Sequence, residues 1–166
     1  MRSLYILRHG KSDWNAAYGH DHDRPLAARG LRAAALVGHF FKGNGWPEAL
    51  WSSSAVRALT TLERALKASG EELRPAVRSE LYGAGVSDVL RLLGVDAEPA
   101  ASVLIAGHEP TCSGLVQATT GARCRYPTAA IARIDFARPT WQDVAAAPRG
   151  ELRWLMTPKA LAHLPR

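Results

Sequence analysis

Two histidines and two arginines follow short apolar runs of the chain. Arg8 and His9 end the N-terminal run LYIL and precede Gly10, His108 ends the run SVLIAG, and Arg57 comes shortly after EALWSS. A guanidinium can bind two phosphate oxygens at once, and a neutral imidazole can attack phosphorus to form a covalent intermediate. Fixed cations also stabilise the charge that spreads over a phosphoryl group in transfer. These residue types therefore predict phosphoryl-transfer chemistry, and Gly10 is expected to let the backbone turn close to the phosphate.

The elements that must position these residues alternate between strands and helices. Apolar runs predict strands at 3–8, 48–53, 75–79, 101–108, 129–136 and 150–157. Helical periodicity, with Gly and Pro as stop signals, predicts helices at 27–42, 54–70, 85–93 and 112–120. The Ala- and Pro-rich segment 137–149 is predicted to be a connecting loop.

This alternation predicts an α/β fold, a three-layer sandwich with a mostly parallel central sheet flanked by helices. In such sheets ligands bind outside the carboxyl ends of the strands. Since three different strands deliver the arginines and histidines to that edge, we expect them to meet there.

Length and composition indicate one globular domain spanning residues 1–166. The 47% hydrophobic and 22% charged content is typical of a folded protein. An apolar run of about 20 residues would be needed to cross a membrane, and the chain has none, nor a leader-like N-terminus. We therefore expect a cytoplasmic protein without a membrane partner.

The net charge of +6 favours an acidic partner, such as a phosphorylated substrate. The basic residues are scattered and do not alternate with aromatic residues as in a single-strand binding groove, so no nucleic-acid partner is expected. Cys112 and Cys124 lack metal-ligand spacing and fit a reducing compartment.

Three motifs resemble those of one family. The stretch LRHGKSDWN resembles the first-strand signature of the histidine phosphatase superfamily, the phosphoglycerate mutase-like group. The stretch SSSAVRALTTLE resembles its second motif, and VLIAGHEP resembles its second-histidine strand. The motifs occur in family order and, with DRPLAARG and LRWLMTPKAL, span most of the chain.

The resemblance implies a metal-independent phosphatase with no organic cofactor, in which His9 is the nucleophile that becomes phosphohistidine. It implies further site residues in two groups. These are Arg8, Arg57 and His108 around the phosphate, and Asn15 and Arg24 in contact with the substrate.

The short chain and the early DRPLAARG segment are most similar to the SixA-type phosphohistidine phosphatases, which implies a phosphorylated protein as partner. A small phosphorylated metabolite stays open as substrate, for a phosphomonoesterase or mutase on the same fold. A phosphate-binding module without turnover is a third alternative. The oligomeric state is open, with a monomer as the default expectation.

Two glutamates have open roles. Glu80 stands where larger family members place a proton donor: if it lies in the site, phosphoesters are favoured, because an alkoxide leaving group needs an acid. If Glu80 lies outside the site, phosphohistidine is favoured. Glu109 would weaken phosphate binding or select a cationic substrate if it pointed inward, and would be neutral to function if it pointed outward.

The segment GHDHD at 19–23 could suggest a metal site. Neighbouring side chains on one flexible segment rarely converge on one ion, so a polar loop near the mouth of the site is the favoured interpretation. Trp14 and Trp46 are predicted to be packing residues.

Overall fold

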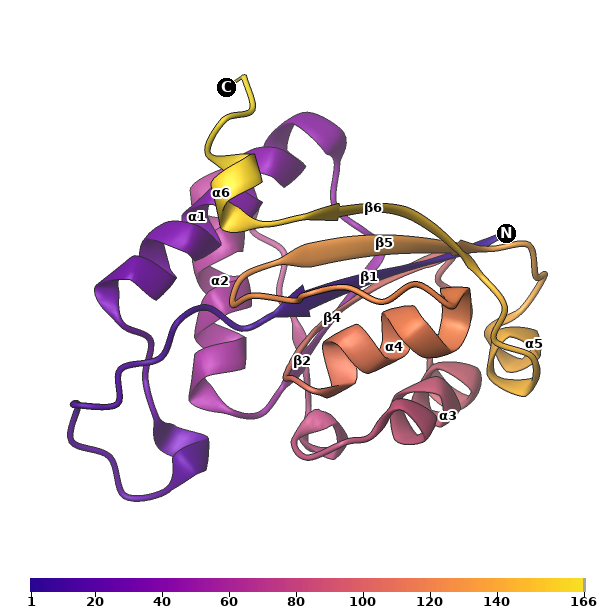
Figure 1. The fold of residues 1–166 in the computed structure, drawn as a ribbon, viewed down its shortest axis with the longest axis horizontal. Coiled ribbons are helices and arrows are strands. Elements are labelled where there is room, and N and C mark those ends of the chain that lie inside the picture. Colours follow the sequence, from indigo (N-terminus) through magenta and orange to yellow (C-terminus); the bar gives the residue numbers. More distant parts are fainter. Residues whose placement is uncertain (166) are drawn as a thin grey trace.

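The predicted strands form one six-stranded sheet with helices on both faces (Figure 1). The computed structural model describes residues 1–165. The strands are β1 (Arg2–Arg8), β2 (Ala49–Ser53), β3 (Ala76–Arg78), β4 (Ser102–Gly107), β5 (Ile131–Phe136) and β6 (Glu151–Met156). The helices are α1 (Ala28–Asn44), α2 (Val56–Ser69), α3 (Val86–Asp96), α4 (Thr111–Thr120), α5 (Trp141–Ala146) and α6 (Pro158–Leu161), with 3-10 turns η1 (Asp21–Asp23) and η2 (Ser79–Leu81).

The sheet order is β3-β2-β4-β1-β5-β6. The pairs β2–β3, β2–β4 and β1–β4 are parallel, whereas β5 runs antiparallel to both β1 and β6. The expected α/β fold with a mostly parallel sheet is therefore confirmed. Because Arg8 pairs in register with Gly107 and Ser52 with Ala106, the carboxyl ends of β1, β4 and β2 lie at one edge.

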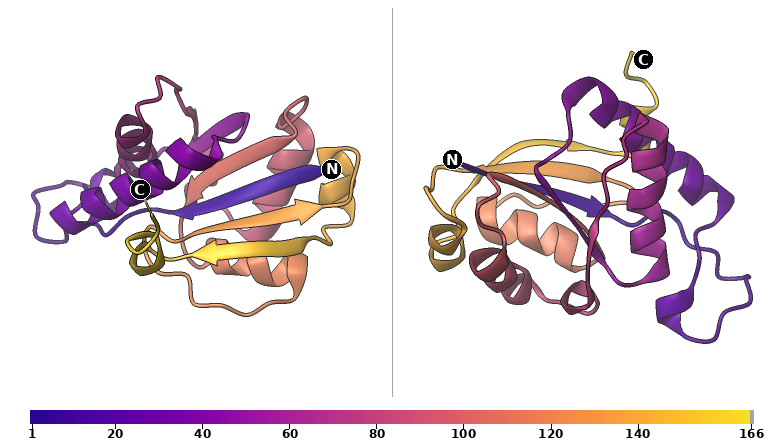
Figure 2. Two further views of the ribbon diagram at one scale, coloured as in Figure 1. Left: turned by 90° about the horizontal axis from the view of Figure 1, so that it is seen from above. Right: turned by 180° about the vertical axis from the view of Figure 1, so that it is seen from behind.

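Alternating side chains of the central strand bind the two helical layers to the sheet. Leu4 and Ile6 of β1 are buried in a core with residues of α3, α4 and α5. Leu7, the next residue along, is buried in a second core with residues of α1, α2 and α6. Figure 2 shows these two sets of helices on opposite faces of the sheet.

The prediction of a connecting loop over 137–149 is wrong, because this segment contains α5. The Thr140 side chain accepts a hydrogen bond from the Asp143 amide and caps the helix. Trp141 is fully buried, and its Nε1–H donates to the Ala100 carbonyl at 2.6 Å. The Ala- and Pro-rich composition is typical of a loop, but the buried side chain of Trp141 anchors the short helix α5 here.

Helices α1 and α2 approach each other closely on one face. A Cβ built on Gly38 of α1 would lie 2.0 Å from the carbonyl oxygen of Ala65, so only glycine fits this crossing. Trp46, just beyond α1, stacks on Phe41 with ring centroids 4.3 Å apart, which confirms its predicted packing role. Within residues 1–165, no helix has the length and apolar character needed to span a membrane.

Candidate active site

The imidazole of His9 is buried at the end of β1 and oriented by its own backbone neighbour. His9 is only 8% exposed, and its Nδ1 lies 2.7 Å from the Gly10 carbonyl oxygen. A carbonyl can only accept a hydrogen bond, so Nδ1 carries the proton. The lone pair is then on Nε2, the nitrogen that is left available for attack.

The end of β1 is held by the segment before β5. The Ala129 amide donates to the carbonyls of both Arg8 and His9, and the Tyr126 hydroxyl donates to the Ile6 carbonyl. Arg8 Nη1 in turn donates to the Tyr126 carbonyl at 2.7 Å. Ala129 adopts a φ of 58°, a strained value for a non-glycine residue that these bonds support. Arg8 and His9 are thus fixed before any ligand binds.

Gly10 allows a close approach between two segments of the backbone. A Cβ on Gly10 would lie 2.9 Å from the Gly30 carbonyl, and one on Gly30 would lie 2.2 Å from the Lys11 carbonyl. These two glycines let the chain after β1 pack directly on the first turn of α1. The Gly10 amide donates to Thr61 Oγ1 at 2.8 Å, and Thr61 Oγ1 donates to the Arg57 carbonyl, so this one hydroxyl links α2 to the chain that follows β1.

The second histidine lies beside the first. The ring centroids of His9 and His108 are 5.3 Å apart, and His108 Nε2 lies 2.8 Å from the hydroxyl oxygen of Ser53, at the end of β2. Its Nδ1 is buried without a hydrogen-bond partner. The end of β2 therefore positions His108 as well as leading into the helix that carries Arg57.

Both imidazoles are neutral at physiological pH. Burial lowers the pKa of His9 to about 4, and the positive charges of Arg57, Arg8 and Arg24 add to this effect. Burial also lowers the pKa of His108 to about 3, with contributions from His9 and Arg57. An uncharged imidazole surrounded by cations is suited to attack a bound phosphate.

The arginine of α2 is engaged by η1. Arg57 donates from Nη1 to the Asp21 carbonyl at 2.8 Å and from Nη2 to Asp21 Oδ2 at 3.0 Å. Arg24 forms an ion pair with the other carboxylate oxygen of Asp21, and the Tyr82 hydroxyl donates to Oδ2 at 2.9 Å. Asp21 thus joins three elements at the edge where the predicted site residues meet.

The two predicted substrate-contact residues differ in their placement. Arg24 is buried, donates to Ser12 Oγ, and lies 3.6 Å from the ring centroid of Trp14. Trp14, predicted to be a packing residue, is 63% exposed and covers this buried guanidinium. Asn15 is exposed on the same segment, where its amide donates to Asp13, and no contact joins it to His9 in residues 1–165.

Glu80 lies apart from the two histidines. It is exposed in η2 and lines a hollow of about 350 Å³ shared with α3 residues such as Asp88 and Arg91. Across the described chain, no hydrogen bond or ion pair joins Glu80 to His9 or His108. The neighbouring Tyr82 is the residue of this turn that reaches the site, with its ring centroid 5.8 Å from that of His108.

The carboxylate of Glu109 turns toward α4. Its two carboxylate oxygens accept hydrogen bonds from the amide and hydroxyl of Ser113, in the first turn of α4. Negative charge at a helix N-terminus is stabilising, so Glu109 has a structural role there. The structure places it in the outward orientation.

The side chains of the GHDHD segment turn to different partners. Asp21 turns to the arginines, while His22 Nε2 lies 2.9 Å from Ser54 Oγ. In residues 1–165 no three His, Cys, Asp or Glu side chains are grouped so that they could hold a metal ion. The segment lies beyond the end of the sheet, beside the N-terminal end of α2 (Figure 1).

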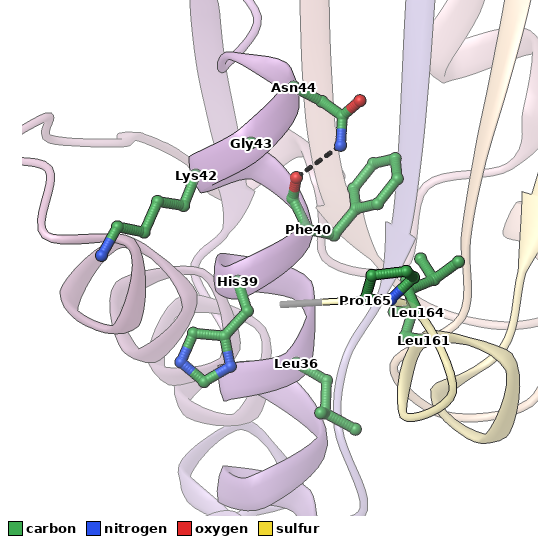
Figure 3. A pocket seen from close by; sticks show the side chains of 9 residues that line it. All are labelled: Leu36, His39, Phe40, Lys42, Gly43, Asn44, Leu161, Leu164 and Pro165. Carbon is green, nitrogen blue, oxygen red and sulfur yellow. Dashed lines mark hydrogen bonds between the residues drawn. The ribbon is translucent and has the colours of Figure 1, made fainter.

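A separate hollow of about 410 Å³ lies between α1 and α6. Its lining includes Leu36, Phe40 and Leu161, while His39 and Lys42 project away from Leu161 (Figure 3). This apolar surface has no arginine, and none of the predicted site residues lies in it.

Sequence reasoning missed four residues of the site: Asp21, Ser53, Thr61 and Tyr82. Ser53 and Thr61 lie inside the stretch SSSAVRALTTLE, so the resemblance of this stretch to the family's second motif is the signal that could have identified them. Asp21 lies in the segment predicted to be a polar loop near the mouth of the site, and no local pattern pairs it with an arginine 36 positions away.

The sequence is similar to a known protein family and to curated relatives. A model of the histidine phosphatase superfamily (branch 1) matches residues 4–82. An uncharacterized protein of Mycobacterium tuberculosis is 33% identical over 150 residues, which cover 83% of this chain and 91% of that protein.

Two solved structures extend the similarity over almost the whole chain. The protein histidine phosphatase SixA complexed with tungstate matches with a TM-score of 0.79 and 26% identity, covering 96% of this chain and 99% of that one. A protein described as phosphohistidine phosphatase SixA, from Nakamurella multipartitia, matches with a TM-score of 0.74 and 28% identity over 95% and 96% of the two chains.

Proposed function

This chain belongs to the histidine phosphatase superfamily and is a phosphatase with a SixA-like structure; we propose that it acts through a phosphohistidine formed on His9. The observation that carries the proposal is the state of this imidazole. His9 is buried, neutral at pH 7, and bonded through Nδ1–H to the Gly10 carbonyl, which leaves the Nε2 lone pair free. Such a nitrogen is prepared to attack phosphorus without first losing a proton.

The surrounding cations are suited to hold the phosphoryl group. The positive charges of Arg57, Arg8 and Arg24 all lower the pKa of His9, and the same charges would stabilise a phosphoryl group bound there. Arg8 and Arg57 each keep a buried Nε without a protein partner. In this proposal Arg8, Arg57 and His108 bind the phosphoryl oxygens, and Arg24 and Asn15 contact the rest of the substrate.

The reaction has two steps. His9 Nε2 forms a bond to phosphorus while the bond to the leaving group breaks, and its electron pair goes to the leaving atom. Water then attacks phosphorus, the bond to Nε2 breaks, and inorganic phosphate and neutral His9 result. Both steps rely on charge already in the protein, so the proposal is metal-independent.

We infer a phosphohistidine of a protein as the substrate, in the cytoplasm. The surroundings of Glu80 support this choice, because it lines the hollow beside α3 and no hydrogen bond or ion pair in residues 1–165 joins it to His9 or His108. An imidazole is a much better leaving group than an alkoxide and needs a protonating acid less. The two SixA structures that this chain resembles are described as phosphatases of histidine-phosphorylated substrates.

The test is hydrolysis of a phosphohistidine peptide and of a panel of alkyl phosphoesters, with chelator present. Wild type, His9→Ala and Glu80→Gln are compared, and His39→Ala, on the outer part of α1, serves as the matched control. Rapid cleavage of phosphohistidine that is lost only in His9→Ala supports the proposal, as does an acid-labile phosphoenzyme absent from that variant. Full activity of His9→Ala would refute it, and alkyl-ester turnover abolished by Glu80→Gln would establish a phosphomonoesterase.

A further inference from the structure

A carboxylate lies among the cations of the proposed site. Asp21 pairs with Arg57 and Arg24 and accepts a hydrogen bond from Tyr82, yet its side chain is 51% exposed. Since none of these contacts involves His9, Asp21 is not part of the attacking machinery. Its place between buried guanidinium groups and solvent suggests that it meets the outer part of a substrate.

Asp21 keeps its negative charge at every physiological pH. Burial alone would raise the pKa of this carboxyl, but the hydrogen bonds from Tyr82, Arg24 and Arg57 outweigh burial and lower the pKa to about 2. A permanently ionised group cannot donate a proton to a leaving group. It can, however, attract a positive charge or repel a negative one.

In the proposed reaction, a leaving group opposite His9 would face the more exposed side of the site, where Asp21 lies. His9 is 8% exposed and forms the inner end of the site, while the outer contacts run from His108 to Tyr82, which is 39% exposed, and on to Asp21. In an in-line displacement the leaving group stands opposite the nucleophile. A nucleophile at the buried end therefore directs the leaving group toward the exposed residues of η1 and η2.

We propose that Asp21 determines specificity by favouring leaving groups that carry positive charge, such as the imidazolium of phosphohistidine, over anionic ones. The inference rests on the proposed function and names a residue for its selectivity. An imidazole departs as a neutral ring only if its second nitrogen is protonated before the P–N bond breaks. A neighbouring carboxylate keeps that proton in place, and the electron pair of the broken bond then neutralises the ring. Glu109 is the other carboxylate that could select a cationic substrate, but it is bonded to Ser113 of α4.

The test compares two small substrates under the same conditions, with chelator present. N-phosphoimidazole has a leaving group that can be cationic, and 4-carboxyphenyl phosphate has an anionic one. The ratio of their kcat/KM values isolates the leaving group, because any effect on phosphate binding cancels. We expect Asp21→Asn to lower this ratio at least tenfold, because a unit charge ~6 Å away in a partly exposed site attracts the cationic leaving group and repels the anionic one. Asp21→Glu should retain most of the ratio, and Asp23→Asn, in the same turn, should leave it unchanged.

An equal loss of activity on both substrates in Asp21→Asn would overturn the inference, since Asp21 would then only position Arg57 and Arg24. If Asp21→Asn, or the wild type itself, turns over neither substrate, the role of Asp21 is tested by comparing ligand affinities instead. Calorimetry with 4-(aminomethyl)phenylphosphonate and 4-carboxyphenylphosphonate should show a preference for the cation in wild type that Asp21→Asn loses. Equal preferences in the two proteins would refute the role of Asp21, whereas an inactive wild type that retains this preference would refute only the proposed catalysis.

Discussion

The hydroxyl of Thr61 offers a sharp test of how the candidate site is held together. It accepts a hydrogen bond from the buried Gly10 amide at 2.8 Å and donates one to the Arg57 carbonyl at 2.6 Å. Thr61→Val keeps the shape of the side chain but leaves the Gly10 N–H unsatisfied in the interior. An orphaned buried donor costs about 1–3 kcal/mol, so we expect the free energy of unfolding to fall by about 2 kcal/mol. In a domain of this size that corresponds to a Tm lower by roughly 4–8 °C.

Activity should fall together with stability. Gly10 follows the proposed nucleophile His9 directly and its carbonyl orients the His9 ring, so loss of the Thr61 link should loosen His9 and Arg57 together. Because small misplacements of reacting groups are costly, we expect kcat on phosphohistidine to fall by about tenfold. Urea unfolding followed by circular dichroism, and steady-state hydrolysis on the same preparations, measure both effects.

Thr119 of α4 provides the matched control. It is also buried, but its hydroxyl bonds only to the Leu115 carbonyl of its own helix, so Thr119→Val orphans no donor. Thr61→Ser should recover most of the lost activity because it restores the hydroxyl. If the free energy of unfolding of Thr61→Val were no lower than that of Thr119→Val, the hydrogen bond between Gly10 and Thr61 would not stabilise the fold, and the prediction would be refuted.

Three further predictions follow from the same structure. Neither His9 nor His108 should titrate between about pH 5.5 and 8 in NMR spectra, because both have a lowered pKa. The same two histidines take up protons near pH 6.5 in the unfolded chain. The free energy of unfolding should therefore decrease as the pH falls from about 6.5 toward 4. Gly38→Ala should destabilise the fold by about 3 kcal/mol or more in urea unfolding, because its Cβ meets the α2 backbone, whereas Gly43→Ala, with open space around it, should be neutral or slightly stabilising. Glu109→Ala should lower stability by about 1 kcal/mol through loss of its bonds to α4 but change phosphohistidine hydrolysis less than twofold; a large loss of kcat would place Glu109 in the site instead.

The parts of the site that the sequence predicted are those attached to ends of strands. Arg8, His9 and His108 follow apolar runs, and parallel pairing brings the ends of such runs to one edge without further information. Arg57 follows the third run by one helical turn. Their meeting could therefore be inferred from the order of motifs along the chain.

The parts that the sequence did not predict depend on tertiary contacts. Asp21 lies on a segment without periodicity, and only the folded chain shows that it turns to Arg57 rather than to a metal. Glu80 and Glu109 each had two placements open in the sequence, and only the fold shows their neighbours: Glu80 lines the hollow beside α3, and Glu109 is hydrogen-bonded to Ser113. Helix α5 was missed because one buried aromatic residue, Trp141, outweighs a composition typical of loops.

The position of β1 in the centre of the sheet has a consequence for how the enzyme is made. Its partners are β4, about a hundred residues later, and β5, later still: Leu4 pairs with Val103 and with Ile134. Contacts of such long range form slowly, because a large loop must close first. A chain growing from the ribosome therefore displays Arg8 and His9 early but cannot fix them until most of its length has emerged. We expect nascent chains that stop before β5 to lack both a closed sheet and activity, so that catalysis reports on completed folding.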